Sequence, residues 1–67
     1  MTKTNQHTRI RTRLKALRED RKMSQTELAT AMGLEHRQTI GHIESGERRI
    51  TPAELVRAAE ALGVALD

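Results

Sequence analysis

Residues 24–46 of the chain read SQTELATAMGLEHRQTIGHIESG, and this stretch decides the fold. Ser24 is followed three residues later by Glu27, which is the reciprocal capping-box arrangement that starts a helix. An apolar stripe with helical spacing comes next, formed by Leu28, Ala29 and Met32. Gly33 then supplies the permissive backbone that ends a helix. The pattern predicts a helix over about 25–32, a glycine turn and a second helix.

The second helix is predicted over about 36–45. Ile40 and Ile43 lie three positions apart and would face inward. The outward positions then belong to Arg37, Gln38 and His42. Arginine and glutamine are the side chains that pair bidentately with guanine and adenine edges in the major groove. Two helices that meet at a tight turn, with such residues early on the second, predict a helix-turn-helix that reads double-stranded DNA.

Four residues are candidates for direct base readout: Arg37, Gln38, His42 and His36. The first two share an outward face with Gly41, near the start of the helix, where side chains reach base edges. His42 lies one step beyond that face, and His36 lies at its margin. An ordinary surface role stays open for each of them, with Arg37 paired to Glu35 or Asp20 instead of a base.

The net charge of +3 is unevenly distributed along the chain. Residues 1–23 hold eight basic and two acidic side chains, a balance of +6, whereas residues 24–67 have a balance of −3. Such asymmetry places an electropositive face on one side of a small body, and this face attracts a polyanion. A solvated basic helix is the plain alternative. Beside a helix-turn-helix, the charge favours contact with phosphate.

Composition argues against several other classes of protein. The 67 residues include no cysteine, which leaves no disulfide or thiolate metal site and suits a reducing cytoplasm. No apolar run approaches the ~18 residues of a membrane span, and no aromatic ring is available for stacking single strands. No nucleotide-binding, nucleophile or zinc motif is present, and the spacing of His7, His36 and His42 matches no recurrent ligand set. We therefore expect no enzyme, metal, cofactor, small-molecule ligand or membrane contact.

The remaining patterns predict an all-α bundle. We expect residues 1–8 to form a flexible basic arm and residues 9–67 to form the domain. Thr51, Pro52 and Glu54 combine an N-cap, a proline at the first helical position and a glutamate at N3, which is a strong helix start. Together with the apolar stripes, these signals predict four helices, over about 8–22, 25–32, 36–45 and 52–62.

Two stretches carry a family resemblance, LKALREDRKMSQTELA (14–29) and TIGHIESGERRITPAELVRAAEALGV (39–64). From about Ile10 to Asp67 the chain resembles the phage lambda repressor and Cro-like helix-turn-helix family, also called the xenobiotic-response-element type. The resemblance implies a fold of usually five helices, here shortened to four. It also implies a transcription regulator that binds operator DNA, commonly as a homodimer, and we expect a repressor.

Phosphate contacts are expected at both ends of the motif. Gln25 and Thr26 begin a helix, where backbone N–H groups and the helix dipole hold anions, and the resemblance also assigns Gln25 such a contact. Further phosphate candidates flank the reading helix: Thr39, Ser45, Arg48 and Arg49. A solvated charged loop is the alternative for the two arginines. The resemblance further implies an internal ion pair between Arg18 and Glu44, which would hold the first helix against the reading helix.

Two features depart from the family pattern. The interval from Gly33 to Ile40 is one residue longer than usual, so the turn or the start of the reading helix must differ locally. Gly41 stands where the family often has serine, and glycine inside a helix costs about 1 kcal/mol relative to alanine. It indicates either a close backbone approach, to DNA or to a neighbouring helix, or a neutral change.

An interaction module is the alternative function. In the same family, the fold also serves as the N-terminal targeting domain of larger regulators, including metallopeptidase-linked ones, and as an antitoxin that binds a toxin. Residues 63–67 stand where the family usually begins a fifth helix, which fits either a minimal protein or part of a longer chain.

Overall fold

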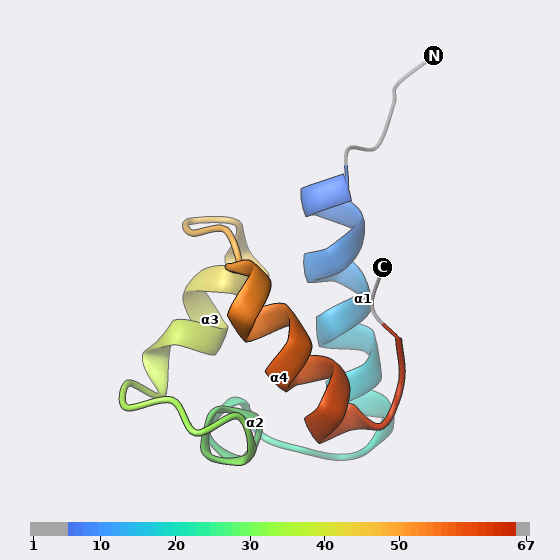
Figure 1. Cartoon of the computed structure of the whole chain (residues 1–67), viewed down its shortest axis with the longest axis vertical. Helices are drawn as coiled ribbons and strands as arrows, with labels where there is room; N and C mark the ends of the chain where they lie inside the picture. The colour runs from blue at the N-terminus through green and yellow to red at the C-terminus, as the bar shows by residue number, and fades with distance from the viewer. Residues whose placement is uncertain (1–5, 66–67) are drawn as a thin grey trace.

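The computed structural model describes residues 6–65, with side chains from Thr8 onward. Within this range the chain forms four helices, α1 (Gln6–Asp20), α2 (Gln25–Ala31), α3 (Gln38–Ser45) and α4 (Pro52–Leu62). Figure 1 shows α4 between α3 and α1, with α2 below them. Contacts join α2 to α3 and α4, and α1 to the same two helices. The predicted all-α, four-helix architecture is confirmed.

The core is aliphatic throughout, because the chain has no aromatic residue. Four large side chains are fully buried: Leu14, Leu28, Ile40 and Ile43. They come from α1, α2 and α3, and Ala58 and Leu62 of α4 complete the cluster. Burial of each large side chain contributes about 1.5–3 kcal/mol. Since the two isoleucines lie on α3, the inward face of that helix is held by the core and its opposite face is left to solvent.

Two capping boxes start α2 and α4. The Ser24 hydroxyl accepts a bond of 2.9 Å from the Glu27 N–H, and the Ser24 N–H donates to the Glu27 carboxylate at 2.7 Å. Thr51 and Glu54 repeat the arrangement at the start of α4, at 3.2 and 2.9 Å. Both predicted helix starts are confirmed. Each box satisfies N–H groups that would otherwise lack an intrahelical partner.

The first helix is shifted relative to its predicted bounds of 8–22. It begins at Gln6, so the last three residues of the expected arm belong to α1, and residues 1–5 lie outside the described residues. It ends at Asp20 because Lys22 adopts a left-handed conformation, with φ of 56°. The Met23 N–H then closes the turn onto the Arg18 carbonyl at 3.0 Å. No glycine marks this end in the sequence.

The second helix of the motif, α3, begins at Gln38, two residues later than predicted. Arg37 occupies the N-cap position with a helical backbone and no side-chain cap, and the Thr39 N–H donates to the His36 carbonyl at 3.0 Å. His36 therefore lies in the connection before α3 and not on the helix. The residue that lengthens the interval from Gly33 to Ile40 is accommodated in this connection, so α3 keeps its inward face.

None of the helices between residues 6 and 65 combines the length and the apolar character needed to cross a membrane.

Candidate nucleic-acid interface

The outward face of α3 carries three of the four residues proposed for base readout. Arg37, Gln38 and His42 are exposed, whereas Ile40 and Ile43 on the opposite face are fully buried. Within residues 6–65, Arg37 and Gln38 form no side-chain hydrogen bond or ion pair, so neither Glu35 nor Asp20 engages the arginine. Their donors are free to meet base edges. The Nδ1 of His42 lies 3.5 Å from the Glu47 carboxylate.

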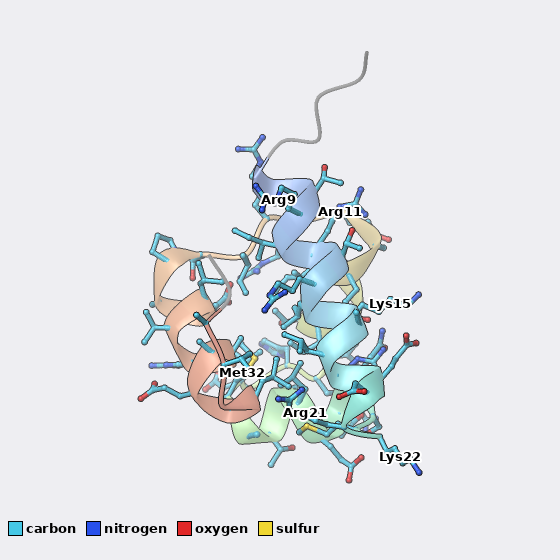
Figure 2. All side chains as sticks on the ribbon, turned by 90° about the vertical axis from the view of Figure 1, so that its right-hand side faces the viewer. Arg9, Arg11, Lys15, Arg21, Lys22 and Met32 are labelled. Carbon is cyan, nitrogen blue, oxygen red and sulfur yellow. The ribbon has the colours of Figure 1, made fainter. Side chains whose placement is uncertain are left out.

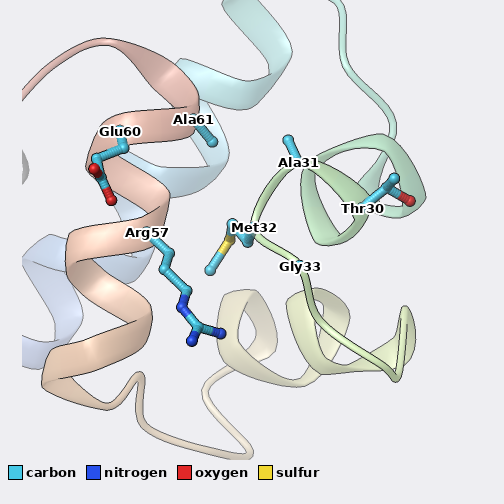
Figure 3. A pocket seen from close by; sticks show the side chains of 7 residues that line it. All are labelled: Thr30, Ala31, Met32, Gly33, Arg57, Glu60 and Ala61. Atoms are coloured by element: carbon cyan, nitrogen blue, oxygen red, sulfur yellow. The ribbon is translucent and has the colours of Figure 1, made fainter.

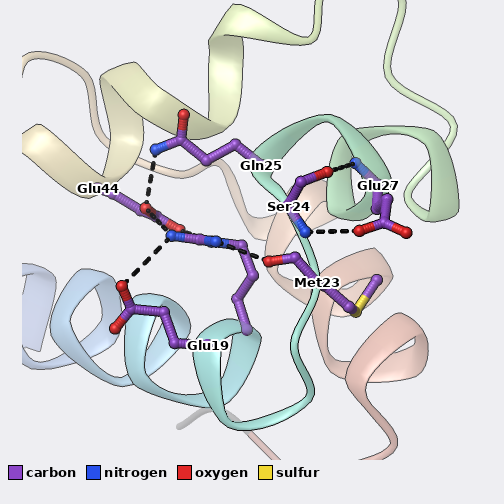
Figure 4. Close-up of polar contacts among 7 residues, drawn as sticks. Glu19, Met23, Ser24, Gln25, Glu27 and Glu44 are labelled. Carbon is purple, nitrogen blue, oxygen red and sulfur yellow. Dashed lines mark hydrogen bonds and ion pairs between the residues drawn. The ribbon is translucent and has the colours of Figure 1, made fainter.

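The Glu44 carboxylate fixes α3 against its neighbours. The Arg18 Nε donates to Glu44 Oε2 at 2.8 Å, and the Arg18 Nη2 donates to Oε1 at 3.1 Å (Figure 4). Only 10% of the arginine side chain and 4% of the glutamate side chain are exposed. The hydrogen bond to Glu44 raises the pKa of Arg18 further above its usual range, and burial opposes it. The charge of Arg18 is thus present at any ordinary pH.

Arg18 also connects α1 to the turn that follows it. Its Nη1 donates to the Met23 carbonyl at 2.7 Å, directly before the capping box of α2. One guanidinium therefore binds the α3 carboxylate and the entrance to α2 at the same time (Figure 4). A buried charge pair is tolerated when its remaining donors are satisfied in this way. The relative placement of α2 and α3, on which a helix-turn-helix depends, is set by this contact.

Gln25, the first residue of α2, is the third partner of the cluster. Its Nε2 donates to Glu44 Oε1 at 3.1 Å, which leaves the second amide hydrogen unused. The side chain lies over Gly41, since a Cβ atom at that glycine would stand 3.4 Å from Gln25 Oε1. This is an ordinary van der Waals distance, so the neighbouring helix does not require a glycine at position 41.

The start of α2 leaves two backbone N–H groups without an intrahelical partner. The capping box engages the backbone N–H of Glu27, so the N–H groups of Gln25 and Thr26 are the ones left over. Both residues are exposed. At the other candidate positions, Thr39 is half-buried at the start of α3, and the Ser45 hydroxyl closes the end of the helix by donating to the His42 carbonyl at 3.1 Å.

The two loop arginines differ sharply in environment. Arg48 forms a bidentate pair with Glu54, Nη1 to Oε1 at 2.9 Å and Nη2 to Oε2 at 2.6 Å. This hydrogen bonding lowers the pKa of Glu54 from its usual 4.5 to about 2. Arg49 is exposed, and the structure gives its side chain no partner among the described residues. The charge of Arg48 is largely neutralised within the domain, while that of Arg49 is available.

Basic side chains follow the whole length of α1. Figure 2 shows Arg9, Arg11, Lys15, Arg21 and Lys22 spread along this helix and the turn after it. All except Arg11 are exposed. Arg11 was not singled out by any motif, although it lies seven positions before Arg18 and therefore shares its face of α1. Glu54 was predicted as the N3 residue of a capping box, but no sequence signal marks its contact with Arg48.

A shallow groove of about 450 Å³ lies between the end of α2 and α4. Met32 and Gly33 line one side of it, and Arg57 and Glu60 line the other (Figure 3). The groove is separate from the outward face of α3. In the described part of the chain, no three potential metal ligands of the histidine, cysteine or carboxylate type come together.

Comparison with known proteins agrees with this geometry. The family model described as "Helix-turn-helix" matches residues 14–67. Among solved structures, the chain is similar to the restriction-modification controller protein C.AhdI from Aeromonas hydrophila. The two share 31% sequence identity with a TM-score of 0.79, over 87% of this chain and 86% of that one. No curated protein sequence matches the chain.

The family model covers most of the chain, and the structural match extends over nearly all of it. The elements that define the motif are present in the described residues: a capped α2, a glycine turn, and an α3 with one buried and one exposed face. The chain belongs to the helix-turn-helix family of DNA-binding domains, in its lambda repressor-like (xenobiotic-response-element) group.

Proposed function

We propose that this domain is a sequence-specific transcription regulator that reads double-stranded DNA by placing α3 in the major groove. The observation that carries the proposal is the pair of unbonded, exposed donors, Arg37 and Gln38, at the start of α3. Side chains at the start of a reading helix are the ones that reach base edges. His42 and His36 are secondary candidates, because the first lies near Glu47 and the second precedes the helix.

Phosphate contacts are proposed on both sides of α3. Gln25 and Thr26 would supply backbone N–H groups and one amide hydrogen at the start of α2. Arg49 would supply a free charge beyond the end of α3, with Thr39, Ser45 and Arg48 as lesser contributors because each is half-buried or already bonded. Such contacts fix the register of the protein on the duplex without reading sequence.

We further propose that the protein acts as a repressor and binds as a homodimer. Occupation of an operator is enough to block transcription, and a small domain needs no further surface for that role. Two copies would read two half-sites one helical turn apart. The likeness to a restriction-modification controller protein supports a regulatory role.

Titration of labelled random-sequence duplex at several salt concentrations tests the proposal. Binding should weaken steeply as salt rises, because each neutralised phosphate releases counterions, with a slope of about −0.9 per contact. Selection from a random duplex pool should then enrich one sequence, and a pseudo-palindromic one if the dimer forms.

Folded protein that binds no duplex even at low salt would overturn the proposal. Binding without enrichment of any sequence would reduce it to a non-specific DNA-binding protein. Sedimentation of the protein with and without the selected duplex tests the dimer separately.

A further inference from the structure

Arg11 is placed at the carboxyl end of the reading helix. It projects from α1, is half-buried, and donates from Nη1 to the Glu44 carbonyl at 3.3 Å. Its guanidinium passes over Gly46, where a Cβ atom would stand 3.1 Å from Nη1 and 3.2 Å from Cζ. The approach thus depends on a residue without a side chain. The last carbonyls of a helix carry partial negative charge, which attracts a cation to this position.

The bonding of Arg11 is incomplete compared with that of Arg18, which is buried, and Arg48, which is half-buried. Arg18 and Arg48 each face a carboxylate, at 2.8 and 2.6 Å. Between residues 6 and 65, Arg11 forms no ion pair, and its one hydrogen bond is long. Its Nε is buried and has no hydrogen-bond partner. Buried polar groups are normally bonded, and partly desolvated charges are normally paired, so this guanidinium lacks a counter-ion.

The surroundings indicate what that counter-ion is. The guanidinium lies beside the turn formed by Ser45 and Gly46, directly before the loop that carries Arg49. A helix in the major groove has a phosphate backbone on each side of it. The free hydrogens on the two terminal nitrogens of Arg11 remain available to such a phosphate, since only one bond from Nη1 is formed.

We propose that Arg11 binds a phosphate of the DNA backbone at the carboxyl end of α3. This inference rests on the proposed function, because it requires α3 to lie in the major groove. In the complex, a phosphate oxygen accepts from the Arg11 Nη groups in a charge-assisted hydrogen bond. The Glu44 carbonyl and Gly46 hold the guanidinium in place before the DNA arrives. Arg11 then contributes affinity and register, and no base specificity.

Salt titration of Arg11→Gln on the selected duplex is the first test. Loss of one phosphate contact should lower the slope of log affinity against log salt by about 0.9, and weaken binding about tenfold at low salt. The matched control is Arg13→Gln, which removes the same charge from an exposed position on another face of α1. The control should change the slope much less. Equal changes in both variants would show a general charge effect and overturn the inference.

A duplex that carries single neutral methylphosphonates gives the second test. At one position, the methylphosphonate should weaken DNA binding by the wild-type protein and should not weaken binding by Arg11→Gln any further. At the other contacted positions it should weaken binding by both proteins. Inorganic phosphate at the same ionic strength should not compete, because the proposed ligand is held by the duplex. Competition by inorganic phosphate alone would assign the site to a free anion and overturn the DNA contact.

A loss of DNA binding must be separated from a loss of folding. Thermal melts of Arg11→Gln and Arg13→Gln are therefore measured first, and binding is measured well below the lower of the two melting temperatures. Arg11→Lys keeps the charge and should keep most of the salt slope, so a slope that falls as far as in Arg11→Gln would contradict the inference. If the wild-type protein binds no duplex, the proposed function fails. If it binds and Arg11→Gln leaves the slope and the methylphosphonate map unchanged, only the role of Arg11 fails.

Discussion

The guanidinium of Arg18 and the carboxylate of Glu44, 26 positions apart in the chain, are joined by two hydrogen bonds at the junction of α1 and α3. Gln25 of α2 donates to the same carboxylate. Three helices therefore meet at one acidic side chain that is almost removed from solvent. Because both charges are buried, each depends on the other, and the loss of either leaves an uncompensated charge.

Glu44→Gln should destabilise the domain by about 3 kcal/mol, at the lower end of the range for a broken buried pair. The substitution keeps the shape of the side chain but leaves the Arg18 charge without its partner. A chain of this length has a total stability of roughly 3–10 kcal/mol, so the loss removes a large share of it and the variant should melt well below the wild type. Thermal melts followed by helical circular dichroism measure the loss.

Glu19→Gln is the control for that experiment. Glu19 also faces Arg18, but at 3.9 Å and with 58% of its side chain exposed. Exposed pairs contribute about 0–1 kcal/mol, so this variant should melt close to the wild type. If both variants melt alike, the burial of the Glu44 pair is not what stabilises the fold.

Gly41→Ala should raise the stability of the domain by about 1 kcal/mol, because alanine is the better helix former. The new methyl group meets Gln25 Oε1 at 3.4 Å, an ordinary contact with a flexible side chain. For a domain of this size, the melting temperature should rise by about 4–8 °C.

Gly46→Ala should act in the opposite direction. Gly46 has a φ of 87°, which favours glycine, and its Cβ would press on the Arg11 guanidinium at 3.1 Å. In thermal melts, Gly41→Ala should therefore have a higher melting temperature than the wild type, and Gly46→Ala a lower one. A Gly46 variant that melts above the wild type would contradict the assigned strain.

Replacement of Arg37 or Gln38 by alanine should cost about 1–3 kcal/mol on the selected operator and relax preference at the contacted base pair. The physical reason is the loss of a bidentate pair with a base edge. Binding is measured on the operator and on a scrambled duplex, with His36 and His42 scanned in the same way. Arg57→Ala, on the groove beside α4, is the control and should have little effect on either. Equal losses of binding free energy on the operator and on the scrambled duplex would show that Arg37 and Gln38 contact phosphates and not bases.

Acid should remove the contribution of the Arg48–Glu54 pair. Pairing with Arg48 lowers the pKa of Glu54 from 4.5 to about 2. Between these two pH values the Glu54 carboxylate is charged in the folded protein and protonated in the unfolded chain. The stabilisation is therefore complete above pH 4.5 and is lost as the pH falls from 4.5 towards 2. Glu54→Gln should lose about 1 kcal/mol at neutral pH and show a flatter stability profile across that acid range. Melts at stepped pH measure it.

Glu60→Gln is the matched control, because Glu60 lies exposed on the same helix without an ion pair among the described residues. Its acid profile should follow that of the wild type. A Glu54→Gln profile as steep as the wild type would mean that other carboxylates carry the acid dependence.

Local signals in the sequence predicted most of the fold. The capping boxes at Ser24 and Thr51, and the inward positions of Ile40 and Ile43, depend only on neighbours three or four residues away, so spacing reveals them. The early end of α1 was missed because Lys22, a residue without an intrinsic preference for positive φ, adopts the left-handed turn that glycine usually marks.

The side-chain partners were harder to predict than the helices. Arg48 and Glu54 meet only because the loop folds back onto the start of α4, and Arg11 reaches Gly46 only because α1 crosses the end of α3. Such contacts depend on how helices are placed in space, which helical periodicity does not encode. The pairing of Arg18 with Glu44 was expected from the family resemblance alone and not from the spacing of the two residues.

One face of α3 is packed into the core and the opposite face is exposed to solvent. This division affects how the sequence of such a domain can change without loss of the fold. Ile40, Ile43 and Glu44 hold the helix in place. Arg37 and Gln38 form no side-chain hydrogen bond or ion pair with the described residues. Exposed positions of this kind accept substitution with effects usually within about 0.5 kcal/mol. Under the proposed readout, single substitutions at these two positions would change the operators that the domain binds without lowering the stability of the scaffold that presents them.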